Sequence, residues 1–180
     1  VNSEYAVFDQ HGNQIAAVRQ VGQSALKKAL RFVGDIDQFM THTFQIVDMA
    51  GNVHLTVTRP RKFIRSQVKI GDGAGRPIGA VVQKNVIGKI NFSLQADGAE
   101  IGSINAETWR AWNFSIQDAS GTEVARITKT WEGLAKTMFT TADNYVLQIH
   151  RPLQDPLRSL VVASALSVDT ALKQDSRGFS

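Results

Sequence analysis

Apolar and polar residues follow two different periods along this chain. From residue 5 to residue 129, short stretches alternate apolar with polar residues, which predicts strands with one buried face. From Leu157 to Leu172 (LRSLVVASALSVDTAL), apolar residues instead fall on every side of a helix. A surface helix keeps one polar face, so this pattern predicts a helix that is buried all round.

A membrane span is the alternative interpretation of residues 157–172, and length argues against it. Only Ser159 to Val168 is free of charged residues. At 1.5 Å per residue this is roughly 15 Å of helix, against a hydrocarbon core of about 30 Å. We therefore interpret the segment as a core helix that the preceding residues must enclose.

The alternating part repeats one hairpin pattern five times. The repeats begin with Tyr5–Gly12, Phe44–Gly51, Val68–Gly75, Phe92–Gly98 and Phe114–Gly121, and alternation resumes after each glycine. We interpret the turns as Asp-x-x-Gly, in which the Asp carboxylate bonds backbone amides ahead of it and Gly accepts a positive φ. Five hairpins give ten strands of an antiparallel sheet that curls and closes.

Two further elements complete the predicted fold. Tyr145, Leu147 and Ile149 alternate as another strand. Residues 23–32 (QSALKKALRF) predict a short amphipathic helix, either a plug over the barrel end or a membrane-surface helix. We expect one domain over residues 1–172 and a polar tail over residues 173–180.

Composition excludes several classes of function. The chain has no cysteine, which excludes disulfides, a thiolate nucleophile and a Cys-type zinc site. No signal peptide is recognisable at the start, and a cytosolic location is expected. The histidines are scattered without metal-ligand spacing, and no Gly-x-Ser-x-Gly or phosphate-loop motif occurs. We expect neither catalysis nor a cofactor.

Positive charge is concentrated in one part of the sequence. Residues 49–96 contain eight Lys and Arg residues against Asp72 alone, a balance of +7, whereas the whole chain has a net charge of +4. Such segregation indicates an anionic partner, either phospholipid or nucleic acid.

The best candidate site is a basic run of eleven residues within that part. Its five cations are Arg59, Arg61, Lys62, Arg65 and Lys69. Arg side chains can grip phosphate, while Phe63 and Ile64 between them could touch acyl chains. A solvated loop after a strand is the alternative. Trp109 and Trp112, which flank Arg110, could lie at headgroup depth, but core packing is the better explanation for at least one of them.

Several short motifs, in this order, resemble the phospholipid scramblase family and, more distantly, the LURP-one-related and Tubby-like proteins. They are Arg59-Pro60, Gly75-x-Pro-Ile-Gly-x-Val-Val-Gln83, Ile127-Thr-Lys-Thr-Trp-Glu-Gly133, Phe139-Thr-Thr-Ala-Asp-Asn-Tyr145, and the apolar helix ending in Val168-Asp169. The resemblance covers roughly residues 5–172. It implies a closed antiparallel barrel of about twelve strands around a hydrophobic C-terminal helix, an α+β fold that is mainly β.

The chain also departs from that family. It lacks the proline-rich N-terminal region and the cysteine cluster that animal scramblases carry. The family's proposed calcium loop would place ligands here at Thr141, Asp143, Tyr145 and Pro152, which leaves one carboxylate. We therefore expect no calcium site.

The leading functional hypothesis is a scramblase-like protein that binds anionic phospholipid peripherally at the cytosolic face of a membrane. It would dock through the five cations of the basic run and could assist transbilayer lipid movement. The alternative hypothesis is a nucleic-acid-binding or protein-interaction module that uses the same basic surface.

Overall fold

Twelve strands and one long helix make up the described part of the chain, which in this computed structural model comprises residues 3–22, 40–60, 67–85, 89–107, 113–129, 137–140 and 145–175. The strands are β1 (Ser3–Asp9), β2 (Gln14–Val21), β3 (Met40–Asp48), β4 (Val53–Pro60), β5 (Gln67–Asp72), β6 (Pro77–Gln83), β7 (Asn91–Ala96), β8 (Ala99–Ala106), β9 (Asn113–Asp118), β10 (Glu123–Lys129), β11 (Thr137–Thr140) and β12 (Tyr145–Ile149), and the helix is α2 (Leu157–Asp175).

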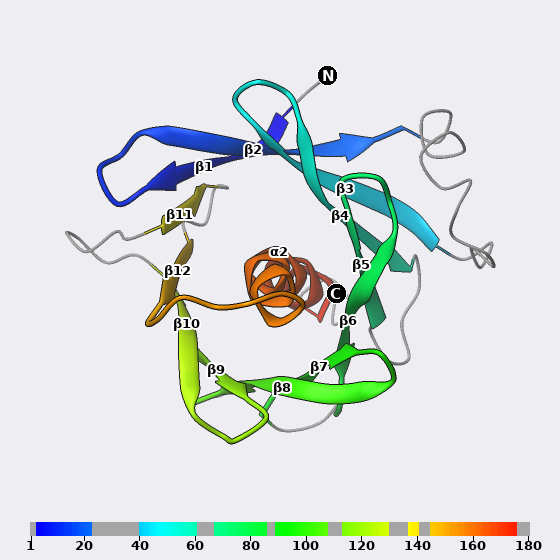
Figure 1. Ribbon diagram of the computed structural model, residues 1–180, viewed down its shortest axis with the longest axis vertical. Helices are drawn as coiled ribbons and strands as arrows, with labels where there is room; N and C mark the ends of the chain where they lie inside the picture. Colours follow the sequence, from blue (N-terminus) through cyan, green and yellow to red (C-terminus); the bar gives the residue numbers. More distant parts are fainter. Residues whose placement is uncertain are drawn as a thin grey trace.

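The strands form one antiparallel sheet that surrounds the helix (Figure 1). Strands β1 to β10 pair in sequence order, so the ten strands predicted from the five repeats are confirmed. β10 then pairs with β12, β12 with β11, and β11 with β1, which is the strand order of a closed barrel. Closure depends on the four-residue strand β11, which meets β12 at Met138↔Val146 and Phe139↔Tyr145.

The sequence pattern did not predict β11. Because β11 lies between β1 and β12, the last two strands are exchanged relative to their order in the chain. A four-residue strand contains too few alternating positions to be recognised from periodicity alone.

Four of the five hairpin turns have the predicted Asp-x-x-Gly structure. In the turn after β3, Asp48 Oδ1 accepts hydrogen bonds from the backbone N–H groups of Ala50 and Asn52 at 2.9 Å each, and Gly51 has a φ of +89°. The turns at Asp9, Asp72 and Asp118 repeat this arrangement.

The fourth turn differs from the prediction. Ala96 pairs directly with Ala99, so only Asp97 (φ +51°) and Gly98 (φ +76°) form the loop. Two positive φ values are typical of a two-residue hairpin loop, for which Asp-Gly is a favoured sequence.

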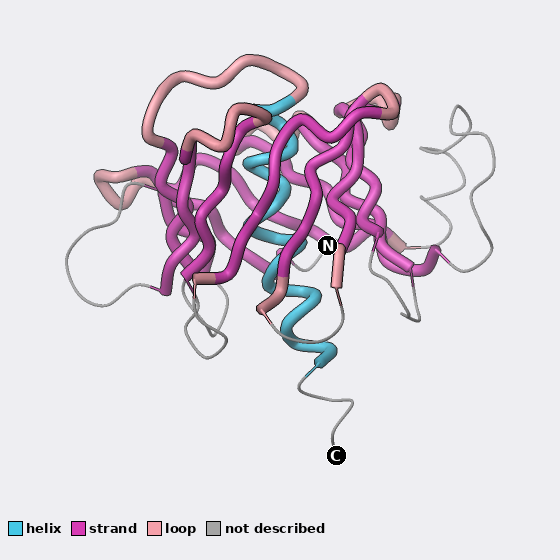
Figure 2. The backbone as a smooth tube through the Cα atoms, turned by 90° about the horizontal axis from the view of Figure 1, so that it is seen from below, coloured by secondary structure: helices cyan, strands magenta, loops and turns pink. Residues whose placement is uncertain are grey.

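The helix α2 occupies the interior of the barrel, as the sequence predicted (Figures 1 and 2). From Ser159 to Val168 every side chain is buried except Val162, which is partly exposed. Two buried serines on α2 bond back to its own carbonyls, Ser164 to Val161 and Ser167 to Ala163. No helix of the described residues is both long and apolar enough to span a membrane.

The start of α2 is fixed by Asp155, whose Oδ1 accepts hydrogen bonds from the backbone N–H of Ser159 at 3.1 Å and its Oγ at 2.6 Å. This is helix capping by a carboxylate. The helix continues to Asp175, beyond the domain boundary expected at residue 172. The helix predicted at 23–32 and the tryptophans at 109, 112 and 131 lie outside the described residues.

Candidate functional site

The barrel has two chemically different ends. Because successive strands run in opposite directions, the turns after β1, β3, β5, β7 and β9 gather at one end, which we call the hairpin end. The opposite end, where β2, β4, β6 and β8 finish, we call the distal end. Helix α2 enters at the hairpin end, and its C-terminal part projects beyond the strands at the distal end (Figure 2).

The hairpin end is rich in aspartate. Its aspartates are Asp9, Asp48, Asp72, Asp97, Asp118 and Asp155. Most of their carboxylates accept hydrogen bonds from backbone N–H groups in the turns, and these bonds favour the charged form of the carboxyl group. At Asp48, hydrogen bonds from the Asn52 side chain, followed by that of His54, hold the pKa of the carboxyl well below its ordinary value.

The arginines that the structure describes at the hairpin end are Arg76, Arg151 and Arg158, and each is engaged with one of these aspartates. Arg76 Nε lies 2.7 Å from Asp72 Oδ2, Arg151 Nη2 lies 2.9 Å from Asp118 Oδ2, and Arg158 pairs with Asp155. Their charges are therefore neutralised locally. The pairs of Arg76 and Arg158 lie within one turn and one helix start, and the pair of Arg151 joins two segments of the chain.

At the distal end, Arg59 of the predicted site lies on the inner face of the sheet. It follows Leu55 and Val57 at a spacing of two, and both of these point into the core. The guanidinium carbon of Arg59 lies 5.5 Å from the centroid of the Phe44 ring, itself only 3% exposed. This is a cation–π contact within the wall.

Lys69 of the predicted site lies on the outer face instead. Its neighbours Val68 and Ile70 are both core residues, so alternation turns Lys69 outward, opposite Thr58 of β4. The structure thus places Arg59 and Lys69 on opposite faces of the sheet. Arg61, Lys62 and Arg65 lie outside the described residues, and their role stays a prediction.

Two further lysines at the distal end were not part of the predicted site. Lys84 and Lys89 border residues 86–88, between β6 and β7. Lys84 Nζ lies 2.7 Å from Glu100 Oε1, whereas Lys89 is exposed and forms no ion pair with any described residue. The charge balance of residues 49–96 was the signal in the sequence that could have included them.

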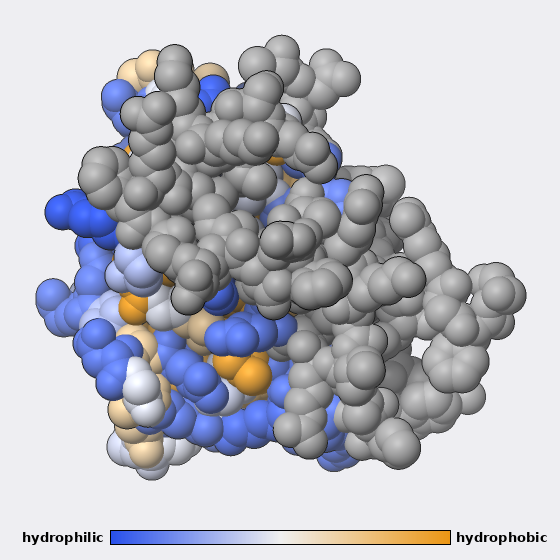
Figure 3. Space-filling model, turned by 90° about the vertical axis from the view of Figure 1, so that its right-hand side faces the viewer, coloured by the Kyte–Doolittle hydropathy of each residue, from blue (hydrophilic) through white to orange (hydrophobic). Residues whose placement is uncertain are grey.

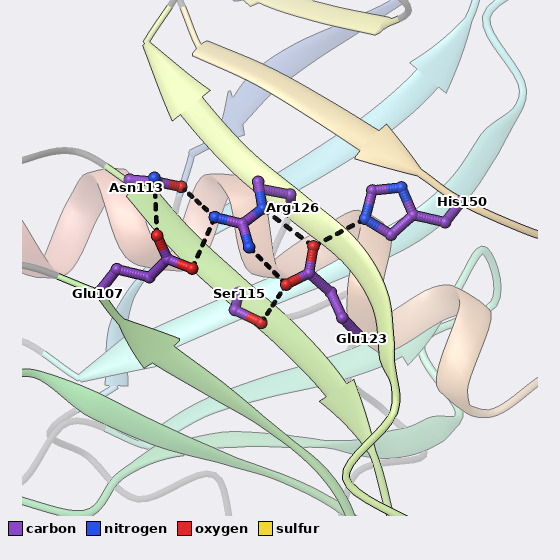
Figure 4. Close-up of polar contacts among 6 residues, drawn as sticks. All are labelled: Glu107, Asn113, Ser115, Glu123, Arg126 and His150. Atoms are coloured by element: carbon purple, nitrogen blue, oxygen red, sulfur yellow. Dashed lines mark hydrogen bonds and ion pairs between the residues drawn. The ribbon is translucent and has the colours of Figure 1, made fainter.

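A polar network runs along the outer wall between the two ends (Figure 4). Its members are Glu107, Asn113, Ser115, Glu123, Arg126 and His150. Arg126 is central: its Nη1 lies 2.8 Å from Glu107 Oε1, and its Nε donates to Glu123 Oε1 at 2.9 Å. These residues come from β9, β10 and the ends of β8 and β12, so the network ties four neighbouring strands together.

Glu123 is the most strongly perturbed group of this network. The Arg126 guanidinium, with Ser115 and His150, lowers the pKa of Glu123 from 4.5 to about 2. Burial opposes this shift but is outweighed by the hydrogen bonds to the charged form. Because the carboxylates and the guanidinium are engaged with one another, the network is a structural clamp rather than a substrate site.

The calcium-loop positions lie far apart where the structure describes them. Tyr145 begins β12 at the distal end and is 3% exposed, whereas Pro152 follows β12 at the hairpin end. A strand of this length spans roughly 17 Å, so one ion cannot contact both positions. Thr141 and Asp143 lie outside the described residues, and the described ones contain no group of three or more metal-ligating side chains. The absence of calcium stays a prediction.

Comparison with known proteins gives the family. The family model described as Scramblase matches residues 1–172. The altered inheritance rate of mitochondria protein 25 of Saccharomyces cerevisiae is 28% identical to this chain over 172 residues. The match covers 81% of this chain and 51% of the yeast protein. The chain therefore spans about half the length of this curated relative. No solved structure matches the chain. Since the match extends over nearly all of its length, the chain belongs to the scramblase family.

Proposed function

We propose that this chain is a scramblase-like protein that binds anionic phospholipids peripherally, at the cytosolic face of a membrane, without catalysing a covalent reaction. The observation that carries the proposal is the position of the basic residues within a member of this family. Lys69 and Lys89 point to solvent at or near the distal end, where β4 and β5 flank residues 61–66 with their three further cations.

The expected affinity follows from the number of cations. A basic residue near an anionic surface contributes about 1 kcal/mol, so five contribute on the order of 5 kcal/mol. This corresponds to a dissociation constant of about 0.2 mM, which allows reversible recruitment rather than permanent anchoring. In this proposal Arg61, Lys62, Arg65, Lys69 and Lys89 bind headgroups, while Arg59 holds the end of β4 against Phe44.

Assistance to transbilayer lipid movement is part of the proposal because of the family. The burial of α2 favours a mechanism in which the docked barrel acts from one side of the membrane and no helix crosses it. Loss of leaflet asymmetry in vesicles carrying a fluorescent lipid measures this activity separately from binding.

The binding proposal is tested by co-sedimentation with phosphatidylcholine vesicles, with and without phosphatidylserine, at low and at physiological ionic strength. We expect binding only to the anionic vesicles, weakening as salt rises. The double variant Arg61→Ala/Arg65→Ala is expected to lose most of this binding. The matched control Arg76→Ala/Arg158→Ala removes two arginines from the hairpin end and is expected to retain it.

Two results would overturn the proposal. Equal binding of the wild type to neutral and anionic vesicles would remove the role of the headgroup, as would wild-type binding by the Arg61/Arg65 variant. Indifference to lipid together with a salt-sensitive gel shift of nucleic acid would instead favour the nucleic-acid-binding alternative.

A further inference from the structure

The two ends of the barrel differ in the sign of their unbalanced charge. At the hairpin end, ion pairs with Asp72, Asp118 and Asp155 neutralise the charges of three arginines, Arg76, Arg151 and Arg158. The other three aspartates form no ion pair with a Lys or Arg among the residues that the structure describes. These are Asp9, Asp48 and Asp97. The hairpin end is thus left with an excess of negative charge.

Toward the distal end the excess is positive. Among the described residues at this end, Glu107 is paired with Arg126, and the C-terminal part of α2 carries Asp169 and Asp175 against Lys173, a balance of −1. Lys69 and Lys89 form no ion pair within the same ranges, and Lys89 is exposed. Excess positive charge is therefore presented by the part of the barrel that surrounds the exit of α2.

We propose that the barrel binds an anionic phospholipid surface end-on, with its distal end against the headgroups and its hairpin end turned to solvent. This inference rests on the proposed function and specifies which surface performs it. Charge complementarity selects the distal end, because a phosphatidylserine surface attracts Lys69 and Lys89 and repels the aspartates that have no Lys or Arg partner.

The dimensions of the molecule support this orientation. The 19 residues of α2 span about 28 Å along the barrel. Electrostatic interactions at physiological salt decay over about 8 Å, so the aspartates of the hairpin end are screened from the membrane in the end-on arrangement. An inverted barrel would bring them against the lipid phosphates, and a side-on barrel would bring them close.

The atoms of the described residues form no broad apolar surface on the side shown in Figure 3. The described atoms there are predominantly hydrophilic, and apolar atoms occur only in small separate patches. The exposed large apolar residues among those described are Ile15, Met49 and Ile149, each near the hairpin end. The described part of this wall therefore presents little apolar surface for insertion into a membrane, and in this proposal charge decides the orientation.

The orientation is tested with single-cysteine probes, because the natural chain has no cysteine. Gln67→Cys places a probe on the exposed first residue of β5 at the distal end, and Met49→Cys places one on a turn residue that is 62% exposed at the hairpin end. Each variant carries an environment-sensitive fluorophore and is mixed with anionic vesicles that contain a headgroup-level quencher.

We expect quenching of the probe at residue 67 and none of the probe at residue 49. Stronger quenching at residue 49, or equal quenching or no quenching at both positions in vesicle-bound protein, would overturn the end-on orientation. Co-sedimentation of the same samples separates the two proposals: if no protein is bound, the proposed function itself fails and the orientation fails with it.

Charge variants give a second readout on the same vesicles. Lys89→Gln and Lys69→Gln are each expected to weaken the vesicle partition coefficient about fivefold, the equivalent of about 1 kcal/mol per cation. Asp97→Asn is the matched control, since Asn also suits a positive φ and the change removes a charge at the hairpin end. Its binding is expected to stay within about twofold of the wild type because of screening. A larger increase for Asp97→Asn than the decrease for Lys89→Gln would contradict the proposal.

Discussion

The guanidinium carbon of Arg59 lies over the Phe44 ring, 5.5 Å from its centroid, inside the wall of the barrel. Arg59 is the first cation of a basic run that looks uniform in sequence, yet its Nε is shielded from solvent while Lys69 points outward. The two described cations of the run therefore have different positions, Arg59 in strand packing and Lys69 on the outer face of the sheet.

Replacement of Arg59 by Met should affect stability more than lipid binding. The change keeps an unbranched side chain but removes the cation–π contact, which contributes about 1 kcal/mol in a partly desolvated site. We expect the free energy of unfolding from urea titration to fall by about that amount, with vesicle affinity within about twofold of the wild type.

Lys69→Gln provides the matched comparison. It should leave the free energy of unfolding within about 0.5 kcal/mol of the wild type, as surface substitutions usually do. If Arg59→Met instead reduced vesicle affinity as much as Lys69→Gln and left stability unchanged, the packing role of Arg59 would be wrong.

Replacement of Gly79 by Ala should destabilise the protein, because the helix passes close to this strand. A β-carbon at residue 79 would lie 2.3 Å from the Gln95 carbonyl oxygen and 3.1 Å from Leu160 Cδ2 of α2. The backbone oxygen cannot move independently of β7, so we expect a loss of about 1–3 kcal/mol of unfolding free energy, typical of overpacked cores.

Gly22→Ala is the control for this change. Apart from its chain neighbours, no atom of the described residues lies within 4 Å of a β-carbon at Gly22, which ends the described segment after β2. Its unfolding free energy should equal or slightly exceed that of the wild type, since Ala restricts the unfolded chain. Equal stability of the two alanine variants in thermal denaturation would argue against close packing of α2 on β6.

The Glu123 clamp should make stability fall with acid. The pKa of Glu123 is about 2 in the folded protein against an ordinary value of 4.5, so the folded state binds this proton less readily than the unfolded state. The stabilisation is fully present above pH 4.5 and is lost as pH falls toward about 2.

Glu123→Gln should remove this component of the pH dependence. The variant keeps the shape of the side chain but not its charge-assisted bonds to Arg126, and we expect a loss of about 1–2 kcal/mol near neutral pH. Urea titrations from pH 7 to pH 3 should show a smaller difference between variant and wild type at the acid end. A difference that stayed constant with pH would show that the carboxylate charge is not the source of the stabilisation.

The sequence by itself determined the repeating hairpins and the burial of the helix. Both follow from local periodicity: strands alternate every two residues, and a helix apolar on all sides has to be enclosed. The turns at Asp9, Asp48, Asp72 and Asp118 were also predictable, because the Asp-x-x-Gly geometry is formed within five consecutive residues. The inward position of Arg59 was also predictable, because Arg59 follows Leu55 and Val57 at a spacing of two. We instead grouped it with the other cations of the basic run.

Only the tertiary structure decided how these elements combine. The insertion of β11 between β1 and β12, and the clamp that joins Glu107, Glu123, Arg126 and His150, depend on contacts between residues far apart in the chain. The same is true of the charge difference between the two ends, because antiparallel pairing sends the turn aspartates to one end and Lys89 to the other. Periodicity states which face of a strand is buried, whereas strand order and register decide which side chains become neighbours.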